Sequence, residues 1–247
     1  MINELNHILF FPDGHRRFAD RKGILYREAY ALGCKKVLEL IRHTLIDEDI
    51  MEVSIVALWD YNLMRTCSDL DDFLDEGAKA IVRIGKDREL QDKGITIGMY
   101  GEMSELFEKR PDYKQVLEAT QRPTTNPRKK LNILLAYSPE REFQRALSVA
   151  IDEGTPPLDI TFDMLLQHTF SPNLVSLAFM SGQQEYDEQP NPFPYLAETM
   201  LHMRNARIYV TNKYFPELTV EDIHAGIEGY RTMLRVLANR RASVNYD

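Results

Sequence analysis

Six short runs of apolar residues recur along the chain, and longer segments with helical periodicity separate them. The runs span residues 8–11, 53–58, 95–100, 131–136, 175–179 and 207–210. They are apolar almost throughout and alternate little with polar residues, which is typical of parallel strands that helices cover on both faces. Each run is therefore predicted to form a buried strand.

The segments between the runs predict helices. Apolar residues at helical spacing mark Tyr26–Leu45, and a helix is expected to start at Ser68 and run to about Arg88. Glu140–Ile151 and Thr219–Asn239 have the same pattern. The repeated order of strand and helix predicts an α/β fold with a mostly parallel six-stranded sheet flanked by helices.

Three connections interrupt this pattern. Arg122–Lys130 is basic and broken by proline, so a solvated turn is expected there. Residues 154–157 (GTPP) end a helix, and residues 182–194 form an acidic loop with three prolines. Because periodic segments continue on both sides of each connection, none is predicted to be a domain linker. Residues 1–247 are therefore expected to form a single domain.

The composition narrows the class of protein. The chain is 44% hydrophobic and 28% charged, as an ordinary globular protein is, and its formal net charge of −8 makes nucleic acid an unexpected partner. Two cysteines cannot build a disulfide scaffold or a four-thiolate zinc site. No apolar run reaches the roughly 18 residues of a membrane helix, and the first residues lack a secretory signal. A cytoplasmic protein with no integral membrane segment is expected.

Candidate chemistry gathers directly after the first predicted strand, where the sequence reads HILFFPDGHRRFA. Ligands of open α/β sheets bind beyond the carboxyl ends of the strands. That place holds the carboxylate of Asp13, a glycine that permits close approach (Gly14), and the side chains of Arg16 and Arg17. Such groups suit a diphosphate, and Asp13 suits Mg²⁺. A plain Pro-Asp-Gly turn followed by solvated arginines is the alternative that these residues leave open.

This stretch resembles the first signature of the cis-prenyltransferases, the family of undecaprenyl diphosphate synthase. The family's His, Asp, Gly, Arg and Ala are kept, whereas its Asn is His15 here and its Trp is Phe18. Asn62 and Arg65 match a second motif, in which Trp59 replaces a serine. The likeness continues through Gly101–Ser104, Leu131–Tyr137 and Phe215–Leu218, and covers nearly the whole chain.

The resemblance implies an enzyme that binds an allylic prenyl diphosphate with Mg²⁺, and a homodimer. Asp13 would be the metal ligand and a catalytic residue, and Asn62 the second catalytic residue, which orients the acceptor or helps to move a proton. The residues expected to bind the allylic diphosphate are Gly14, His15, Arg16, Arg17, Phe18, Tyr26, Tyr30 and Arg65. Of these, His15 is expected to be able to change its charge near neutral pH.

The family's second diphosphate site depends on an arginine motif that this sequence lacks. The corresponding residues 180–187 read MSGQQEYD, and no Lys or Arg occurs between Arg145 and Arg204. A later glutamate of the family's metal site is replaced by Arg207. Because a diphosphate needs several cationic donors, the sequence predicts an acceptor other than isopentenyl diphosphate. The prenyl group would pass to another small molecule or cyclise, as in terpenoid or secondary metabolism.

Two alternatives stay open. The first is a non-catalytic subunit or binding protein, which Arg207 and the replacement of a family arginine by Tyr26 favour. The second is a conventional chain-elongating cis-prenyl diphosphate synthase. The six histidines show no spacing typical of a metal site, so all of them except His15 are expected to be packing or surface groups.

Overall fold

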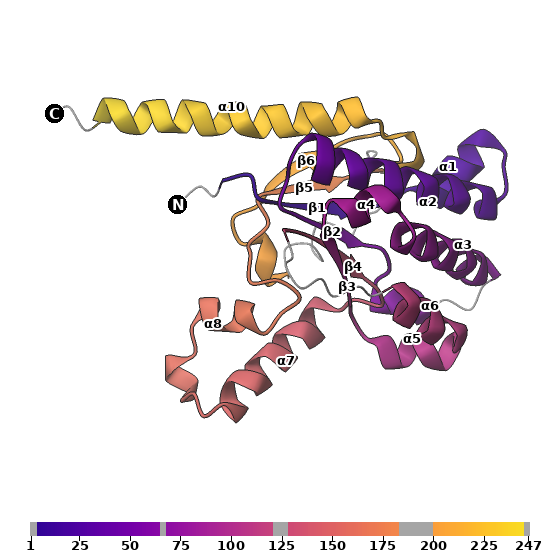
Figure 1. The fold of residues 1–247 in the computed structure, drawn as a ribbon, viewed down its shortest axis with the longest axis horizontal. Helices are drawn as coiled ribbons and strands as arrows, with labels where there is room; N and C mark the ends of the chain where they lie inside the picture. Colours follow the sequence, from indigo (N-terminus) through magenta and orange to yellow (C-terminus); the bar gives the residue numbers. More distant parts are fainter. Residues whose placement is uncertain (1–3, 65–67, 121–127, 183–199, 245–247) are drawn as a thin grey trace, which may run out of the picture.

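The computed structural model describes residues 4–64, 68–120, 128–182 and 200–244 (Figure 1). Within these ranges one sheet has six strands in the order β3-β4-β2-β1-β5-β6, and every neighbouring pair is parallel. The strands are β1 (His7–Phe11), β2 (Glu52–Val56), β3 (Ile95–Tyr100), β4 (Lys129–Leu134), β5 (Leu177–Met180) and β6 (Arg207–Val210). The predicted fold class is therefore confirmed, and all six predicted strands are present.

Both faces of the sheet are covered, which explains why its strands are apolar along their length. Alternate residues of β1 point to opposite faces: Ile8 and Phe10 belong to a large core cluster, and Leu9 and Phe11 to a smaller one. All five residues of β1 are buried. The centre of the sheet therefore has no wet side that would call for polar alternation.

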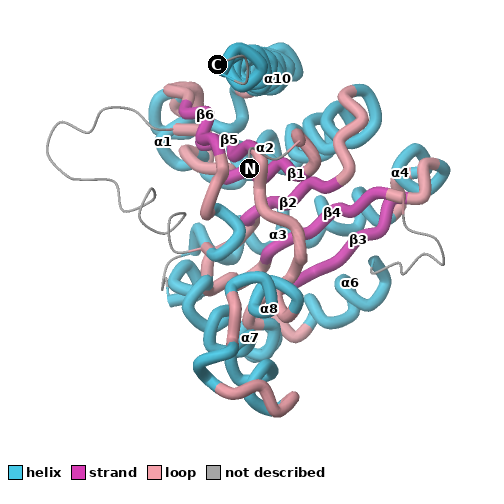
Figure 2. Tube along the Cα trace, turned by 90° about the vertical axis from the view of Figure 1, so that its left-hand side faces the viewer, coloured by secondary structure: helices cyan, strands magenta, loops and turns pink. Residues whose placement is uncertain are grey.

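Helices flank the sheet on either side (Figures 1 and 2). They are α1 (His15–Lys22), α2 (Tyr26–Arg42), α3 (Ser68–Gly85), α4 (Arg88–Asp92), α5 (Met103–Lys109), α6 (Asp112–Thr120), α7 (Pro139–Asp152), α8 (Phe162–Gln167) and α10 (Val220–Val244). Buried residues of α2, α3, α6 and the start of α10 join the large cluster. The helices α7 and α8 pack side by side in a lobe that projects from the body of the molecule (Figure 1).

Five short helical turns complete the described elements: the π-helical turn η1 (His43–Asp47) and the 3₁₀ turns η2 (Asp60–Met64), η3 (Pro157–Asp159), η4 (Leu201–Met203) and η5 (Phe215–Glu217). The helix predicted for residues 26–45 thus changes to a π turn after Arg42. The helix predicted from Ser68 to about Arg88 ends at Gly85, because Asp87 caps a new helix by accepting the N–H of Leu90 at 3.0 Å.

Two of the predicted connections need comment. The prediction of a turn over Arg122–Lys130 is wrong at its end, since Lys129 and Lys130 open β4. The Lys129 ammonium meets Asp49 at 2.5 Å. Residues 122–127, like most of the predicted acidic loop (183–194), lie outside the described residues. The helices α5, α6 and α8 were not predicted.

The parallel arrangement places the carboxyl ends of the strands at one edge of the sheet. Phe11 at the end of β1 is in register with Met180 at the end of β5, and Val56 of β2 with Leu134 of β4. Side chains that follow these residues therefore meet at one edge. None of the helices described is long and apolar enough to span a membrane.

Candidate active site

The turn after β1 fixes a carboxylate and a helix start at the carboxyl edge. Gly14 has φ 91°, and a Cβ at this position would lie 2.5 Å from Cδ1 of Tyr214. Glycine is therefore required both by its backbone and by its neighbour. Its N–H donates to Oδ1 of Asp13 at 2.6 Å, and α1 begins at the next residue.

Arg17, one turn into α1, ties Asp13 to the end of β5. Its Nη2 donates to Oδ2 of Asp13 at 2.8 Å, and its Nη1 donates to the carbonyl of Gly182 at 2.7 Å. The hydroxyl of Ser181 accepts the N–H of Asp13 at 3.0 Å. The Asp13 side chain is still 32% exposed. The carboxylate is thus held in one orientation and yet remains open to a ligand.

A cavity of about 550 Å³ opens beside this turn. Its wall contains both predicted catalytic residues, Asp13 and Asn62, and six of the eight residues predicted to bind the diphosphate: Gly14, His15, Arg16, Arg17, Tyr26 and Tyr30. The other lining residues come from β2, η2 and the start of α3, with Pro12 and Asp20 from the β1–α1 region. The structure therefore brings together residues that are separated by about 50 positions in the sequence.

Two buried polar atoms in this wall have no hydrogen-bond partner within the described part of the chain. They are Nδ2 of Asn62, a donor, and Oδ1 of Asp69, an acceptor. The other carboxylate oxygen of Asp69 lies 3.5 Å from Nη1 of Arg16. Buried polar groups without partners are uncommon in native proteins and often mark a place for a ligand or water.

Sequence reasoning missed Asp69. The available signal was its place in the first turn of the helix after β2. Residues that follow the carboxyl end of a buried strand lie where ligands of α/β sheets bind. A motif comparison that stops at Arg65 does not reach this residue. The side chain is 9% exposed.

His15 lies in the cavity wall, but the prediction that it changes charge near neutral pH is wrong. Its ring lies 5.8 Å from the rings of Tyr30 and Phe215, and a Cβ on Gly33 would come within 2.1 Å of its Nε2. This burial lowers the pKa of His15 to about 4, against the opposing effect of Asp13. The imidazole is therefore neutral at pH 7.

Three other predicted residues have different outcomes. Phe18 does not line the cavity; it is buried in a cluster with Ala19, Ala29 and Tyr214, because it lies on the face of α1 that packs on the protein. Tyr30 meets Phe73 edge to face at 5.2 Å. Arg65 lies outside the described residues.

Tyr26, at the mouth of the cavity, is 36% exposed. A hydrogen bond with Asp20 raises the pKa of Tyr26, so its hydroxyl stays protonated at neutral pH. Here it provides a neutral polar group where the resemblance leads one to expect an arginine.

Arg207 lies at the amino ends of the strands, whereas Asp13 lies at their carboxyl ends. It opens β6, where it pairs in register with Leu177, which in turn pairs with Ile8. Asp13 follows Ile8 by five residues, or about 16 Å of extended strand. The change to Arg207 therefore leaves the cavity of its own chain unaltered.

A narrow apolar space of about 70 Å³ continues from the cavity, between the sheet and the helices α2 and α3. The two spaces share Pro12, His15, Ala57 and Phe73. Cys34 lines the narrow part, where burial raises the pKa of its thiol to about 12. The thiol is therefore an unreactive packing group.

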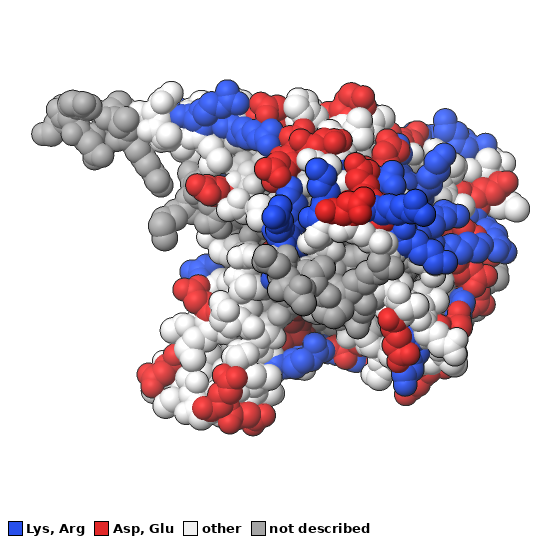
Figure 3. Space-filling model, viewed as in Figure 1, with Lys and Arg blue, Asp and Glu red and all other residues white. Residues whose placement is uncertain are grey.

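Charge is unevenly spread over the outside of this region. Lys and Arg side chains gather over α1 and the start of α2, on the right of Figure 3, whereas acidic side chains mark the tip of the α7–α8 lobe. Arg16, Arg21 and Arg27 belong to the basic area, with side chains 44–49% exposed. An anion approaching the cavity from this side meets positive charge.

The donor atoms at the cavity suit Mg²⁺. The Asp13 side chain is 32% exposed, and Asp69 contributes a second carboxylate whose Oδ1 has no hydrogen-bond partner among the described residues. Mg²⁺ is usually held by one or two carboxylates together with phosphate oxygens and water. Both residues line the same cavity, so the set of hard oxygen donors is the one this ion prefers.

Comparison with known proteins identifies the class. The model of the family described as "Putative undecaprenyl diphosphate synthase" matches residues 11–187, which include the whole turn after β1 and the wall of the cavity. The chain belongs to this family, the cis-prenyltransferases.

Individual relatives are distant. The chain is 24% identical over 242 residues to an isoprenyl transferase of Rickettsia prowazekii, a match that covers 97% of this chain and 100% of that protein. It is 28% identical over 165 residues to the human dehydrodolichyl diphosphate synthase complex subunit DHDDS, covering 64% of this chain. That match spans about half, 48%, of the human protein.

Solved structures confirm the fold. Lavandulyl diphosphate synthase from Lavandula x intermedia, solved with dimethylallyl diphosphate, superposes with a TM-score of 0.72 at 20% identity, covering 92% of this chain and 94% of that one. An undecaprenyl diphosphate synthase structure from Campylobacter jejuni gives a TM-score of 0.64 at 20% identity, with 93% and 96% covered.

Proposed function

We propose that this chain is a Mg²⁺-dependent cis-prenyl diphosphate synthase that joins a short allylic diphosphate to isopentenyl diphosphate. The observation that carries the proposal is the cavity beside the turn after β1, at the carboxyl ends of the strands. It combines the Asp13–Arg17 pair, the glycine turn, and the unpartnered atoms of Asn62 and Asp69.

The donor's diphosphate would lie against the start of α1. The first N–H groups of a helix lack acceptors within the helix, and Arg16 and Arg17 add two guanidinium groups at the cavity wall. Negative charge grows on the diphosphate as the allylic C–O bond breaks. Donors that are already in place stabilise that charge without reorganising. Mg²⁺ held by Asp13 and Asp69 would neutralise part of the same charge.

The neutral state of His15 fits this arrangement. Its ring lies between the cavity and the apolar space, next to Tyr30 and Phe73. An uncharged imidazole can border the apolar prenyl tail, where a cation would pay a desolvation penalty. Charged residues would thus surround the diphosphate of the donor, and uncharged residues would surround its apolar tail.

The size of the apolar space supports a short donor. The apolar space of about 70 Å³ is small beside the cavity of about 550 Å³ from which it continues. Tyr113 borders this space, and its hydroxyl donates to the carbonyl of Leu74 at 2.5 Å. The space therefore suits the end of a short tail and not a long polyprenyl chain. The lavandulyl diphosphate synthase structure contains dimethylallyl diphosphate, a five-carbon allylic donor.

The names of the relatives support isopentenyl diphosphate as the acceptor. Their names describe isoprenyl transferases and diphosphate synthases, among them a geranylgeranyl-diphosphate-specific enzyme of Pyrobaculum aerophilum. The sequence predicted an acceptor other than isopentenyl diphosphate, and these comparisons do not support that prediction. Of the segment that motivated that prediction, residues 180–187, only 180–182 belong to the described residues.

The test is incorporation of radiolabelled isopentenyl diphosphate by the purified chain with Mg²⁺ and donors of five, ten or fifteen carbons. We expect labelled prenyl diphosphate, and Asp13→Asn should lower the rate by about 100-fold or more. Asp112→Asn is the matched control, because Asp112 also pairs with an arginine, Arg110, at 2.8 Å but does not line the cavity.

Three outcomes separate the alternatives. Label in the product that depends on Asp13 supports the proposal. Release of pyrophosphate without incorporation of label would contradict isopentenyl diphosphate as the acceptor and would still support the proposed donor site. If wild type and Asp13→Asn both lack turnover, the enzymatic proposal fails, and the non-catalytic subunit becomes the better account.

A further inference from the structure

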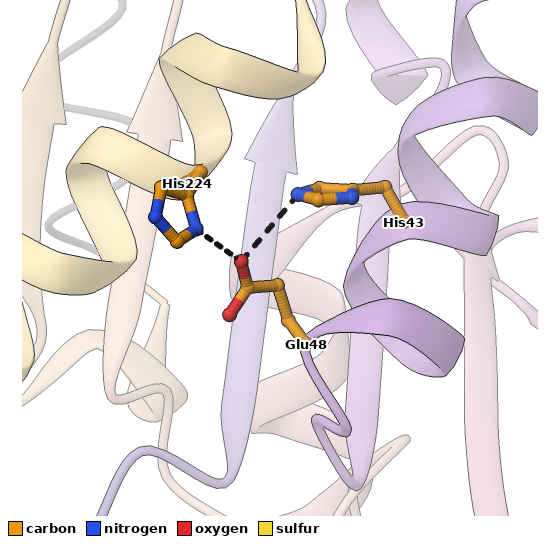
Figure 4. A group of neighbouring side chains, drawn as sticks. All are labelled: His43, Glu48 and His224. Carbon is orange, nitrogen blue, oxygen red and sulfur yellow. Dashed lines mark hydrogen bonds and ion pairs between the residues drawn. The ribbon is translucent and has the colours of Figure 1, made fainter.

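Two histidines and a glutamate meet at the other end of α2, away from the cavity. His43 and Glu48 come from the η1 turn and the residue after it, and His224 comes from the second turn of α10, 176 positions later in the chain. Figure 4 shows both imidazoles directed at one carboxylate. From Tyr30 in the cavity wall to His43 is thirteen residues, or about 20 Å of helix.

The distances within this cluster suit a metal ion. One ligand atom from each residue lies within 4.8 Å of the other two. Nε2 of His43 is 3.5 Å from Oε1 of Glu48, close to the roughly 3.4 Å that separates two ligands of a tetrahedral zinc ion. Nδ1 of His224 is 2.5 Å from the same oxygen, and its side chain is 58% exposed, so it can move outward to admit an ion.

His43 is prepared to be a ligand. Its Nδ1 lies 3.1 Å from Oδ2 of Asp47, which fixes the ring and leaves Nε2 as the free nitrogen. Nε2 is buried and has no hydrogen-bond partner among the described residues. A carboxylate on the far nitrogen of a metal-binding histidine is the usual arrangement in zinc sites. The cluster therefore contains a buried ring nitrogen that faces the Glu48 carboxylate and has no hydrogen-bond partner among the described residues.

Glu48 offers one oxygen to the cluster. Its other oxygen, Oε2, accepts from Nη1 of Arg231 at 2.8 Å, and the side chain is only 8% exposed. Arg231 in turn pairs with Glu228 at 2.9 Å, which balances its charge.

The π-helical turn builds the site. In η1 the N–H of Glu48 bonds to the carbonyl of His43, five residues back, at 2.9 Å. This widened turn lets both Asp47 and Glu48 reach the ring of His43. Single π turns interrupt helices at a cost in stability and occur frequently at functional sites.

We infer that His43, Glu48 and His224 form a binding site for a divalent transition-metal ion of the zinc class that joins the start of α10 to the end of α2. Zn²⁺ accepts two imidazole nitrogens and one carboxylate oxygen as ligands, whereas Mg²⁺ and Ca²⁺ prefer sets made of oxygen alone. Water completes the coordination on the exposed side of His224. The bound ion stabilises the first turns of α10, where Ile223 and Ile227 are already in the core.

The test is calorimetric titration of the untagged, chelator-treated chain with Zn²⁺ in excess Mg²⁺. We expect one ion per chain, an affinity at least 10-fold weaker in His224→Gln and in Glu48→Gln, and about 10-fold weaker in Asp47→Asn. His168→Gln is the matched control, because this imidazole also meets a glutamate, Glu153, at 3.3 Å but belongs to no such cluster. Its affinity should equal that of wild type.

A spectroscopic measurement guards against variants that disturb the fold. Co²⁺ in place of Zn²⁺ should show the visible bands of a four-coordinate site in wild type and in Asp13→Asn, and not in His224→Gln. The site is overturned if wild type binds no tighter than His224→Gln, or if Asp13→Asn or His168→Gln abolishes binding. Neither result depends on turnover, so the proposed function stands or falls separately.

Discussion

Nδ2 of Asn62 and Oδ1 of Asp69 are both buried in the wall of one cavity, and neither has a hydrogen-bond partner among the described residues. A buried donor and a buried acceptor that are each left unsatisfied cost free energy in the folded chain. A polar ligand that contacts both recovers that cost. The binding free energy of such a ligand therefore includes the two hydrogen bonds that these atoms do not form in the free protein.

Asn62→Ala should lower catalytic efficiency by about 10-fold or more and leave the free energy of unfolding nearly unchanged, because no strong hydrogen bond of the free protein is lost. Asn173→Ala is the control: its amide donates to Glu52 at 2.7 Å, so this variant should lose about 1–3 kcal/mol of stability. Urea unfolding and initial rates measure both effects. Equal losses of stability in the two variants would contradict a ligand role for Asn62.

Gly14→Ala should destabilise the chain by about 2–4 kcal/mol, because left-handed backbone strain adds to the clash with Tyr214. Gly23→Ala has the strain without the clash, since φ is 65° and no atom lies within 4 Å of the added Cβ. It should cost about 1–2 kcal/mol. The difference between the two unfolding free energies isolates the contact with Tyr214, and a difference near zero would show that Tyr214 moves aside freely.

Stability should fall as the pH is lowered from 7.5 to 5.5. Burial lowers the pKa of His15 to about 4, below the 6.5 of an unfolded chain, so the unfolded state takes up a proton in this window that the folded state does not. The stability from this residue is complete above pH 6.5 and is lost as the pH falls toward 4. Its share between pH 7.5 and 5.5 is about 1 kcal/mol.

His15→Gln is the variant that measures this share, since glutamine does not titrate. Urea unfolding at the two pH values should show a pH dependence smaller by about 1 kcal/mol than in wild type. His202, whose pKa burial also lowers to about 4, keeps its own contribution in both proteins. An unchanged pH dependence would mean that the His15 ring is solvated.

Phe73→Ala should shift donor preference toward longer chains. Phe73 borders both the cavity and the apolar space, so removing its ring widens the passage between them. The ratio of kcat/KM for a ten-carbon donor over a five-carbon donor should rise by about 10-fold. Phe107→Ala removes a partly buried ring packed against the same core but not lining either space, so its ratio should stay at the wild-type value.

The strands and the turn after β1 could be predicted because their signals are local. A run such as residues 8–11 is apolar on both faces, and Pro12–Gly14 can end it in only a few ways. The short helices α5, α6 and α8 carry too few turns for a clear periodicity, and tertiary contacts decide them.

The missed features of the sites depend on contacts between distant residues. The low pKa of His15 comes from burial among Tyr30, Gly33 and Phe215, which no pattern near residue 15 reveals. The same holds for His43 and His224, which had been expected to be ordinary packing or surface groups. Phe18 was assigned to the ligand because it stands at the tryptophan position of the family's first signature, although the face of α1 on which it lies packs on the protein.

The most direct test of the account is a crystal structure of the chain with Mg²⁺ and a non-reactive allylic thiodiphosphate. The account predicts the diphosphate against the Gly14–His15 helix start, within hydrogen-bond distance of Arg16 or Arg17, with its tail directed toward Phe73. A ligand bound elsewhere, or a cavity that stays without ligand at millimolar concentration, would contradict it.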